Sequence, residues 1–408
     1  MVDHPLAERA MTAGRRAFGP RWQPGRVATA PGRIELLGNH LDYNGGPVLA
    51  AAIDRSISVF TGSDDSGLRG LVADVAGARV ETFDPAALAG WRNAGAPESY
   101  DYVRGAVASI QSRVDMALRE DLDFVIAGDV PMGFGLSSSA ALCVSLILSL
   151  TEHQPSERDL VLAAQEAEHR AGTPCGTMDQ SASVAGGMIC FDGSTLAVEK
   201  LSPDLGAYVF AVADSGVERS LGSSAYGRRV EESALALRHI SSLLGREMTH
   251  LADLTGEQLS AVSERLDQLE PVLLKRARHV VSETVRVRQG KQAADRNDWP
   301  AFGRLMTSSG RSSAIDYEIS HPRVEELVSE ACRVPGVLGA RMMGGGEGGT
   351  ALTLLRRDSV DALNQSLRRG YYRRYDMSSR DDLIHVCAFS KGAHAMSISR
   401  GVSPTPSM

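Results

Sequence analysis

The amino-acid sequence predicts an α+β protein with two lobes that divide near residue 205. Apolar segments with strand character are mixed with long segments of helical periodicity, and the two kinds do not alternate regularly as βαβ units would. The length of 408 residues allows two or three domains with a large core. We therefore expect an N-terminal domain over residues 1–205 and a C-terminal domain over residues 206–408.

Strands are predicted where short apolar segments end at turn-forming residues. They cover residues 48–59, 122–127, 186–192, 207–213, 338–342, 351–355 and 383–388. Helices are predicted where apolar residues recur every three to four positions, or where an apolar segment is too long for a typical strand. They cover residues 140–150, 156–169, 226–244 and 259–289. Ser156 and Asp159 fit a capping box at the start of the second helix, and Gly172 and Pro174 prevent its continuation.

Charge and cysteine content argue against several classes of protein. The net charge of −7 gives no electrostatic reason for binding nucleic acid or an anionic membrane. The five cysteines are odd in number and far apart, which argues against a disulfide framework and against a cysteine zinc site. Residues 1–20 lack the apolar run of a signal peptide, and the longest apolar segment, 140–150, is too short to cross a bilayer. We expect a cytoplasmic monomer or weak homo-oligomer without a nucleic-acid or membrane partner.

A glycine-serine loop over residues 131–141 (P-M-G-F-G-L-S-S-S-A-A) has the chemistry of an anion site. Its two glycines let the backbone approach a ligand closely. Its three serines stand where a helix begins, so free backbone N–H groups and the helix dipole favour an anion. The loop lacks the lysine of a G-x-x-x-x-G-K-[ST] motif, and a flexible loop with a serine N-cap is the alternative. The residues concerned are Gly133, Gly135, Leu136, Ser137, Ser138 and Ser139.

A second segment, A-P-G-R-I-E-L-L-G-N-H-L-D-Y-N-G-G over residues 30–46, is dense in polar residues and suits a polyhydroxylated ligand. Carboxylates accept hydrogen bonds from sugar hydroxyls, while Arg, Asn and His donate them. The alternative is a solvated loop with a turn at Asn44 and Gly45. His40 and Asp42 also have the chemistry of metal ligands, but no third ligand accompanies them.

Two further segments gain weight only in combination with these. Residues 343–350 (M-G-G-G-E-G-G-T) hold more glycines between two predicted strands than a hairpin requires, although glycine runs also occur in linkers. Such a loop can press its backbone against phosphates or close a site. Asp179 lies in the segment C-G-T-M-D-Q over residues 175–180, where a lone aspartate is usually a cap or a turn residue.

Together, the four segments resemble the GHMP small-molecule kinases, and among them the galactokinases. The glycine-serine loop is similar to the phosphate loop of that family, and residues 30–46 resemble the galactokinase signature A-P-G-R-V-N-L-I-G-E-H-T-D-Y-N-G-G. Residues 174–180 and 342–349 are similar to the family's P-C-G-I-M-D-Q and M-T-G-G-G-F-G-G. Four motifs in the same order across most of the chain are far more specific than any one of them.

The resemblance implies a two-lobed kinase with its site between the lobes, which uses ATP and Mg²⁺ to convert galactose to galactose 1-phosphate. Asp179 matches the proposed catalytic base and Arg33 the residue paired with it; such an arginine keeps the aspartate ionised and steadies a developing oxyanion. Ser139 and Glu168 match metal-binding positions, although the spacing from Glu168 to Asp179 is slightly shorter than usual. The glycine-serine loop is then the ATP site. The matching substrate positions are Asn39, His40, Asp42, Gly176 and Tyr226.

Two of the positions at which the signature departs from the family bear on the sugar. Glu35 stands where galactokinases have Asn, and Asn39 stands where they have a Glu that contacts the sugar near C6. A neutral Asn39 would not repel an acidic sugar. The alternatives are therefore a kinase for a related sugar, such as galacturonate or arabinose, or a catalytically inactive sugar-sensing relative. The presence of both Arg33 and Asp179 favours catalysis over sensing.

Overall fold

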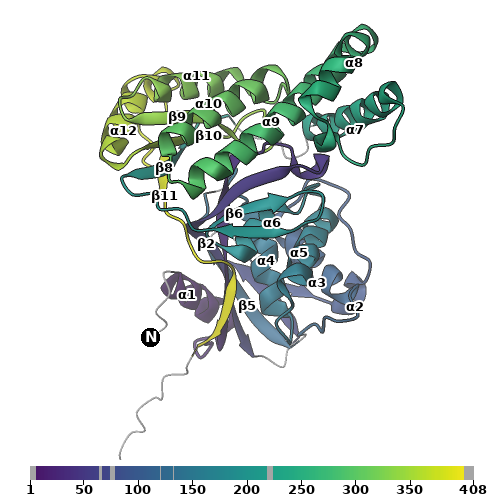
Figure 1. Ribbon diagram of the computed structural model, residues 1–408. Coiled ribbons are helices and arrows are strands. Elements are labelled where there is room, and N and C mark those ends of the chain that lie inside the picture. The colour runs from purple at the N-terminus through teal and green to yellow at the C-terminus, as the bar shows by residue number, and fades with distance from the viewer. Residues whose placement is uncertain are drawn as a thin grey trace, which may run out of the picture.

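A computed structural model describes residues 6–63, 67–73, 79–119, 121–131, 133–217 and 224–398. Two lobes lie one above the other in Figure 1, and each is built around its own sheet. Helices and largely antiparallel strands are mixed in both lobes, which confirms the predicted α+β class.

The larger sheet has eight strands within the described residues and forms the lower lobe of Figure 1. Its main path runs β12-β1-β2-β5-β3-β4, with β6 and β7 continuing from β2. Only β3 and β5 are parallel among the described pairs. The strands are β1 (Arg26–Leu37), β2 (Pro47–Ser63), β3 (Leu68–Val72), β4 (Glu81–Phe83), β5 (Leu122–Gly128), β6 (Met188–Asp192), β7 (Val198–Leu201) and β12 (His394–Ser397).

The helices of the lower lobe are packed against this sheet. Helix α4 is buried at every position from Ala140 to Leu150, because the sheet lies on one side of it and helices α3 and α5 lie close by. Ser156 accepts the Asp159 backbone N–H at 3.1 Å, so the predicted N-cap of α5 is confirmed. The helices are α1 (Ala7–Phe18), α2 (Pro85–Leu88), α3 (Ser99–Gln111), α4 (Ser138–Leu150), α5 (Glu157–Ala171) and α6 (Met178–Ala185).

The smaller sheet forms the upper lobe, with strand order β11-β8-β10-β9. Its strands are β8 (Tyr208–Asp214), β9 (Val337–Met343), β10 (Thr350–Arg356) and β11 (Ile384–Cys387). The helices of this lobe are α7 (Ser224–Leu244), α8 (Gly256–Leu269), α9 (Pro271–Asp295), α10 (Trp299–Ile315), α11 (Pro322–Cys332), α12 (Val360–Arg369) and α13 (Tyr371–Arg374). Single 3-10 turns are η1 (Asp42–Asn44), η2 (Leu251–Asp253) and η3 (Arg357–Ser359).

Two predictions about these elements need correction. The single helix expected over 259–289 is two helices, because Pro271 forces Glu270 out of helical conformation (φ −153°, ψ 88°) and starts α9 instead. The segment 30–46 begins inside β1, a twelve-residue strand that is buried almost throughout, so it is not a solvated loop. Every other predicted helix and strand is found, with ends shifted by at most four residues.

The two lobes are not simply consecutive along the chain. The chain passes from the larger sheet to the smaller one between β7 and β8. It returns at its C-terminal end, where β12, the yellow strand in the lower lobe of Figure 1, pairs with β1 in the larger sheet. The proposed division into 1–205 and 206–408 stays a prediction. The largest hydrophobic cluster joins the lobes, since it contains Ile34, Phe210 and Val280.

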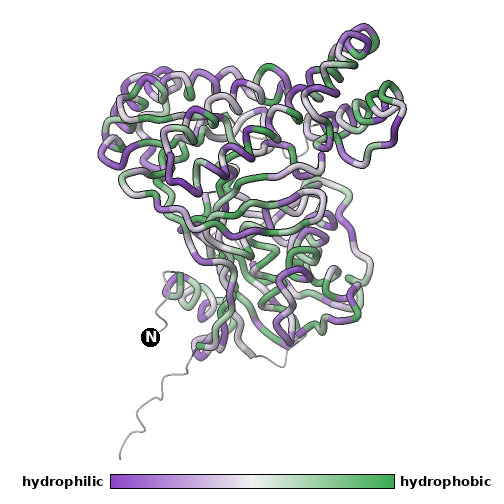
Figure 2. The backbone as a smooth tube through the Cα atoms, in the orientation of Figure 1, coloured by the Kyte–Doolittle hydropathy of each residue, from purple (hydrophilic) through white to green (hydrophobic). Residues whose placement is uncertain are grey.

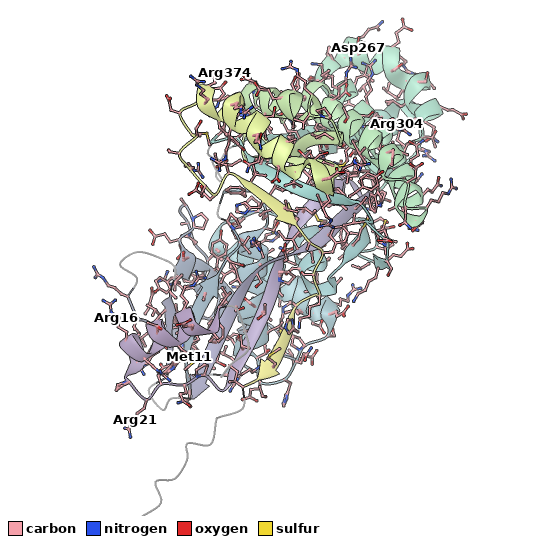
Figure 3. The ribbon with its side chains drawn as sticks, turned by 90° about the vertical axis from the view of Figure 1, so that its left-hand side faces the viewer. Met11, Arg16, Arg21, Asp267, Arg304 and Arg374 are labelled. Atoms are coloured by element: carbon pink, nitrogen blue, oxygen red, sulfur yellow. The ribbon has the colours of Figure 1, made fainter. Side chains whose placement is uncertain are left out.

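Hydropathy follows this architecture. The apolar residues in Figure 2 concentrate on the inner strands and on the helices beside them. Charged side chains such as Arg16, Arg21, Arg304 and Arg374 extend from the outer surface in Figure 3. Among the described helices, none combines the length and the apolar character that a membrane crossing needs.

Candidate active site

Strand β1 delivers the first functional side chains. Its pairing with β2 is regular from Arg33 to Glu35, so both residues point to the same face of the sheet. The strand ends at Leu37, and the chain then turns through Gly38 (φ 105°) and His40 (φ 60°) into η1. This turn directs the polar part of the signature toward the smaller sheet.

Arg33 and Asp179 form a bidentate ion pair. Arg33 Nε donates to Asp179 Oδ1 at 2.7 Å, and Arg33 Nη2 donates to Oδ2 at 2.8 Å. A third guanidinium nitrogen, Nη1, donates to the Gly135 carbonyl at 2.6 Å. Asp179 is the second residue of α6 and not part of a loop, and its side chain keeps 27% of its exposure. The arginine is therefore fixed, while the carboxylate still faces open space.

The glycine-serine loop lies directly against this pair. Gly133 and Gly135 have positive φ of 81° and 67°, and Ser137 adopts the left-handed conformation with φ 56°. Ser137 Oγ donates to Asp179 Oδ2 at 2.5 Å. The Leu136 carbonyl accepts the Arg33 backbone N–H at 3.0 Å. The loop and the ion pair thus share one location, as the family resemblance implies.

Ser138 and Ser139 begin helix α4, where the first backbone N–H groups have no carbonyl one turn earlier to bind. The loop also contacts the smaller sheet, because Thr350 Oγ1 on β10 donates to the Phe134 carbonyl at 2.8 Å. This end of α4 consequently lies where the two lobes meet.

A second carboxylate, that of Glu168, lies near the ion pair and next to Ser139. Glu168 lies on α5 with 2% exposure and accepts a hydrogen bond from Gln180. Burial raises the pKa of Glu168 to about 7, and a hydrogen bond from Ser139 opposes part of this rise. The Gln180 Oε1 atom is buried without a partner. A buried carboxylate with little positive charge around it suits a bound cation.

A nucleotide-bound Mg²⁺ fits this donor set. Within the described part of the chain, no three His, Cys, Asp or Glu side chains are grouped to hold a metal ion. Magnesium in nucleotide sites is usually bound by one or two protein oxygens together with phosphates and water. The hydroxyl of Ser139 and the carboxylate of Glu168 supply oxygens of this kind.

The predicted substrate positions His40, Asp42, Gly176 and Tyr226 gather next to Asp179. A Cβ atom at Gly176 would lie 2.0 Å from Asp42 Oδ2, so glycine is needed for the carboxylate to occupy its place. The rings of His40 and Tyr226 are 5.3 Å apart. Burial raises the pKa of Asp42 to about 7, and the negative charge of Asp179 adds to the rise.

His40 is held as a neutral ring. Burial lowers its pKa to about 3. Its Nδ1 is 2.8 Å from the Tyr43 hydroxyl and its Nε2 is 3.3 Å from the Gly345 carbonyl. A carbonyl only accepts, so Nε2 donates and Nδ1 accepts from Tyr43. The imidazole thereby connects the signature with the glycine-rich segment over residues 343–350.

Asn39 differs from the expectation that it contacts the sugar. Its side chain has no exposed surface. Asn39 Nδ2 donates to Glu35 Oε1 and to the Gly344 carbonyl, both at 2.9 Å. Its Oδ1 accepts from Ser313 Oγ at 3.2 Å. The amide is thus fully used inside the protein.

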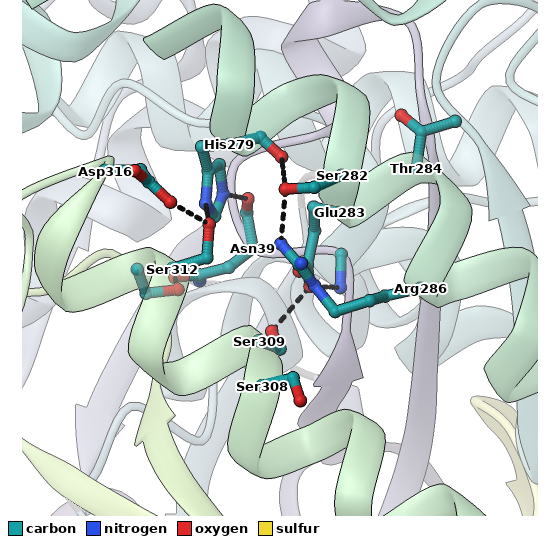
Figure 4. A network of polar contacts seen from close by, with 12 residues as sticks. Asn39, His279, Ser282, Glu283, Thr284, Arg286, Ser308, Ser309, Ser312 and Asp316 are labelled. Atoms are coloured by element: carbon teal, nitrogen blue, oxygen red, sulfur yellow. Dashed lines mark hydrogen bonds and ion pairs between the residues drawn. The ribbon is translucent and has the colours of Figure 1, made fainter. Parts of the chain in front are cut away.

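A buried polar network under the signature turn was not predicted (Figure 4). Glu283 on α9 accepts hydrogen bonds from the Gly38 backbone N–H, from Ser309 and from Arg286. His279 Nε2 lies 3.0 Å from the Asn39 carbonyl. In the sequence, such charges on a long helix look like an ordinary solvated face, so no signal distinguished them.

Comparison with known proteins agrees with this arrangement. Three family models match the chain: the galactokinase galactose-binding signature over residues 15–62, the GHMP kinase N-terminal domain over 101–187 and the GHMP kinase C-terminal domain over 291–373. The Leishmania major mevalonate kinase in complex with R-mevalonate has the same fold, with a TM-score of 0.61 at 18% identity over 90% of this chain and 98% of its own. The fold and the loops at its centre are those of a GHMP kinase.

Proteins of higher sequence identity narrow the assignment within the GHMP kinases. The galactokinase of Roseiflexus sp. (strain RS-1) is 35% identical over 90% of this chain and 92% of its own length. Human galactokinase is 35% identical over 91% and 94%. The crystal structure of Lactococcus lactis galactokinase complexed with galactose has a TM-score of 0.84 at 25% identity, covering 94% of this chain and 98% of its own. This chain belongs to the galactokinase family, and it is an ATP-dependent sugar kinase that phosphorylates an alcohol group.

Proposed function

We propose that this protein transfers the γ-phosphate of ATP to the anomeric hydroxyl of galactose and forms galactose 1-phosphate. The observation that supports this most directly is the contact of Asp179 with both Arg33 and Ser137. It joins a carboxylate, a guanidinium and the start of an anion-binding helix at one point. A sugar sensor without turnover has no need for this combination.

Asp179 acts as the base in this proposal. Its Oδ2 accepts two hydrogen bonds, from Arg33 and from Ser137, whereas Oδ1 accepts one, from Arg33. Oδ1 therefore keeps an acceptor position for the sugar hydroxyl and takes its proton as the oxygen attacks phosphorus. Arg33 balances the charge of the carboxylate and lies close to the developing oxyanion.

Holding the reactants in line and stabilising the developing charge together account for most of the rate acceleration in phosphoryl transfer. The backbone N–H groups of Ser138 and Ser139 at the start of α4 would bind the phosphates, with Gly133, Gly135 and Leu136 shaping the loop. Ser139 and Glu168 would hold the Mg²⁺ of the nucleotide, which supplies positive charge to the transferred group when bound.

His40, Asp42, Gly176 and Tyr226 would contact the sugar on the other side of Asp179. We further propose a cytoplasmic location and a monomeric or weakly homo-oligomeric state without nucleic-acid or membrane partners. The five free cysteines support a reducing compartment.

ADP release measured with galactose, galacturonate and arabinose tests the proposal. We expect turnover that depends on ATP and Mg²⁺, with galactose as the preferred sugar. A clear preference for galacturonate or arabinose would assign the chain to a related sugar. Sugar binding in calorimetry without any ADP release would identify a sensor and contradict the proposal.

A further inference from the structure

Glu35 is placed to contact the substrate, although we singled it out only as a departure from the family signature. The pairing of β1 with β2 is continuous over Arg33, Ile34 and Glu35. Side chains two residues apart on a strand share one face and are separated by about 7 Å. Arg33 holds the proposed catalytic Asp179, so Glu35 lies about one sugar ring farther along the same face.

The carboxylate of Glu35 is fixed through one of its two oxygens. Oε1 accepts from Arg341 Nη2 and from Asn39 Nδ2, both at 2.9 Å. Arg341 is completely buried, and it also donates to the carbonyls of Leu36 and Met342. These contacts tie β1 to β9 of the smaller sheet, so the position of the carboxylate depends on neither lobe alone.

The second oxygen, Oε2, accepts no hydrogen bond from the described residues, although the side chain keeps only 6% of its exposure. Oε2 is also not one of the fully buried side-chain atoms that lack a partner, so part of its surface remains accessible. A nearly buried carboxylate oxygen that still meets open space has an unused acceptor position, and a hydrogen-bond donor there is favourable because the desolvation cost is already present.

Electrostatics place the Glu35 carboxylate near the sugar side of the site. The pKa of Asp42 is raised first by burial, and the negative charges of Asp179 and Glu35 add to the rise. Glu35 is thus close enough to Asp42 to interact with it, and Asp42 in turn borders Gly176 and Asp179.

We infer that Glu35 is a specificity-determining residue whose Oε2 accepts a hydrogen bond from a sugar hydroxyl on the far side of the ring from the reacting anomeric hydroxyl. For galactose, this is the hydroxyl at C4 or at C6. The inference rests on the proposed sugar-1-kinase function and assigns to Glu35 the contact that we had expected of Asn39. It also excludes acidic sugars, because the carboxylate of galacturonate would meet that of Glu35.

The experiment compares kcat/KM for galactose, 4-deoxygalactose, 6-deoxygalactose and galacturonate. In the wild-type protein, one deoxy sugar should lose about 10- to 100-fold, the usual effect of losing a hydrogen bond to a charged group. Galacturonate should not be phosphorylated at a measurable rate. In Glu35→Gln, an amide N–H replaces the acceptor at Oε2, and at best it donates a neutral hydrogen bond to the same hydroxyl. The deoxy penalty should therefore fall by about threefold or more relative to the wild-type penalty, and galacturonate should improve relative to galactose.

A matched control and a second variant separate specificity from folding. Ser313→Ala removes the donor to Asn39 Oδ1 without touching Glu35, and it should leave the ratio between galactose and its deoxy analogues unchanged. If Glu35→Gln unfolds because Arg341 loses its charge partner, the double variant Glu35→Asn/Asn39→Glu restores a carboxylate beside Arg341 and is measured in its place. It should keep turnover of galactose but change which deoxy analogue is penalised or by how much.

The outcomes distinguish this inference from the proposed function. The role of Glu35 is overturned if both deoxy sugars are phosphorylated as fast as galactose, or if galacturonate is phosphorylated rapidly. Either result leaves the sugar-1-kinase function intact. An unchanged deoxy penalty in the folded Glu35→Gln variant does the same. Absence of galactose turnover in the wild-type protein overturns both.

Discussion

Two arginine–carboxylate pairs lie on either side of the signature turn, and they differ in what they leave open. Arg33 and Asp179 bind each other at 2.7 Å, and the aspartate keeps 27% of its exposure and a free acceptor position on Oδ1. Arg286 and Glu283 bind each other at 2.6 Å, but Glu283 has no exposure. Its Oε1 also accepts from the Gly38 N–H at 2.9 Å and from Ser309 at 2.6 Å.

The difference separates chemistry from support. Burial by itself raises the pKa of Glu283, but the positive charge of Arg286, together with smaller contributions from His279, Arg341 and the Ser309 hydrogen bond, outweighs it and lowers the pKa to about 2. Glu283 therefore remains ionised and saturated, which suits a residue that fixes the Gly38 backbone. Asp179 is unsaturated, which suits a residue that must accept a proton from substrate. Variants of the two carboxylates should consequently fail in different ways.

The largest expected effect is on catalysis. Asp179→Asn keeps the shape of the side chain but removes the base, and we expect kcat to fall by about 10²–10⁴-fold. Sugar binding in calorimetry should persist, and the free energy of unfolding should change by no more than about 1–2 kcal/mol because the site is partly solvated. Wild-type turnover in Asp179→Asn would remove this residue from the mechanism.

The second effect is on stability. Glu283→Gln should lower the free energy of unfolding by about 3 kcal/mol, since it removes a fully buried charge that pairs with the half-buried Arg286. Chemical denaturation measures this directly. Glu264→Gln is the matched control on the exposed face of α8, and it should change stability by less than about 0.5 kcal/mol. Equal effects of both variants would mean that the Glu283 pair adds nothing to stability.

The contrast also explains how far the sequence was informative. The glycine-serine loop and helix α4 were predictable because their chemistry is local: small residues, hydroxyls and a long apolar segment stand next to one another. The pairing of Arg33 with Asp179 came from the family resemblance, because 146 residues separate them and no local signal connects them.

Other parts depend on contacts that no short segment encodes. Strand β1 was not predicted, because its charged Arg33 and Glu35 interrupt the apolar pattern expected of a strand that is buried on both faces. Glu283 and Arg286 look like a surface pair three residues apart on a helix, and only the contact with Gly38, 245 residues away, makes them internal. By contrast, the break at Pro271 is encoded locally, because proline restricts the backbone of the residue before it.

Glu168 is buried like Glu283, but it is assigned a functional role like Asp179. The pH dependence of its contribution to stability tests this assignment. Burial raises its pKa from 4.5 to about 7, so its contribution to stability is fully present below pH 4.5 and is lost as the pH rises through about 7. Glu168→Gln should therefore stabilise the metal-free protein by about 3 kcal/mol at pH 8 but only about 1 kcal/mol at pH 5. Chemical denaturation at the two pH values measures the difference, and an equal effect at both would contradict the assignment.

The same variant should weaken the binding of Mg²⁺. If Glu168 binds the nucleotide's metal, its replacement raises the Mg²⁺ concentration needed for half-maximal turnover. A stabilised protein with an unchanged Mg²⁺ requirement would show that Glu168 is buried for packing alone.

Ser137 allows the smallest effects to be separated into two causes. Its hydroxyl donates to Asp179 Oδ2, and its backbone is in the left-handed region, where a side chain other than glycine costs about 1–2 kcal/mol. Ser137→Ala and Ser137→Gly both remove the hydrogen bond, so both should lower kcat by about tenfold, the lower end for a bond to a charged group. Only Ser137→Gly relieves the backbone, so it should be about 1 kcal/mol more stable than Ser137→Ala. If Ser137→Gly recovered wild-type kcat, the left-handed backbone would matter to catalysis through the shape of the loop, and the hydroxyl would have no part in holding Asp179.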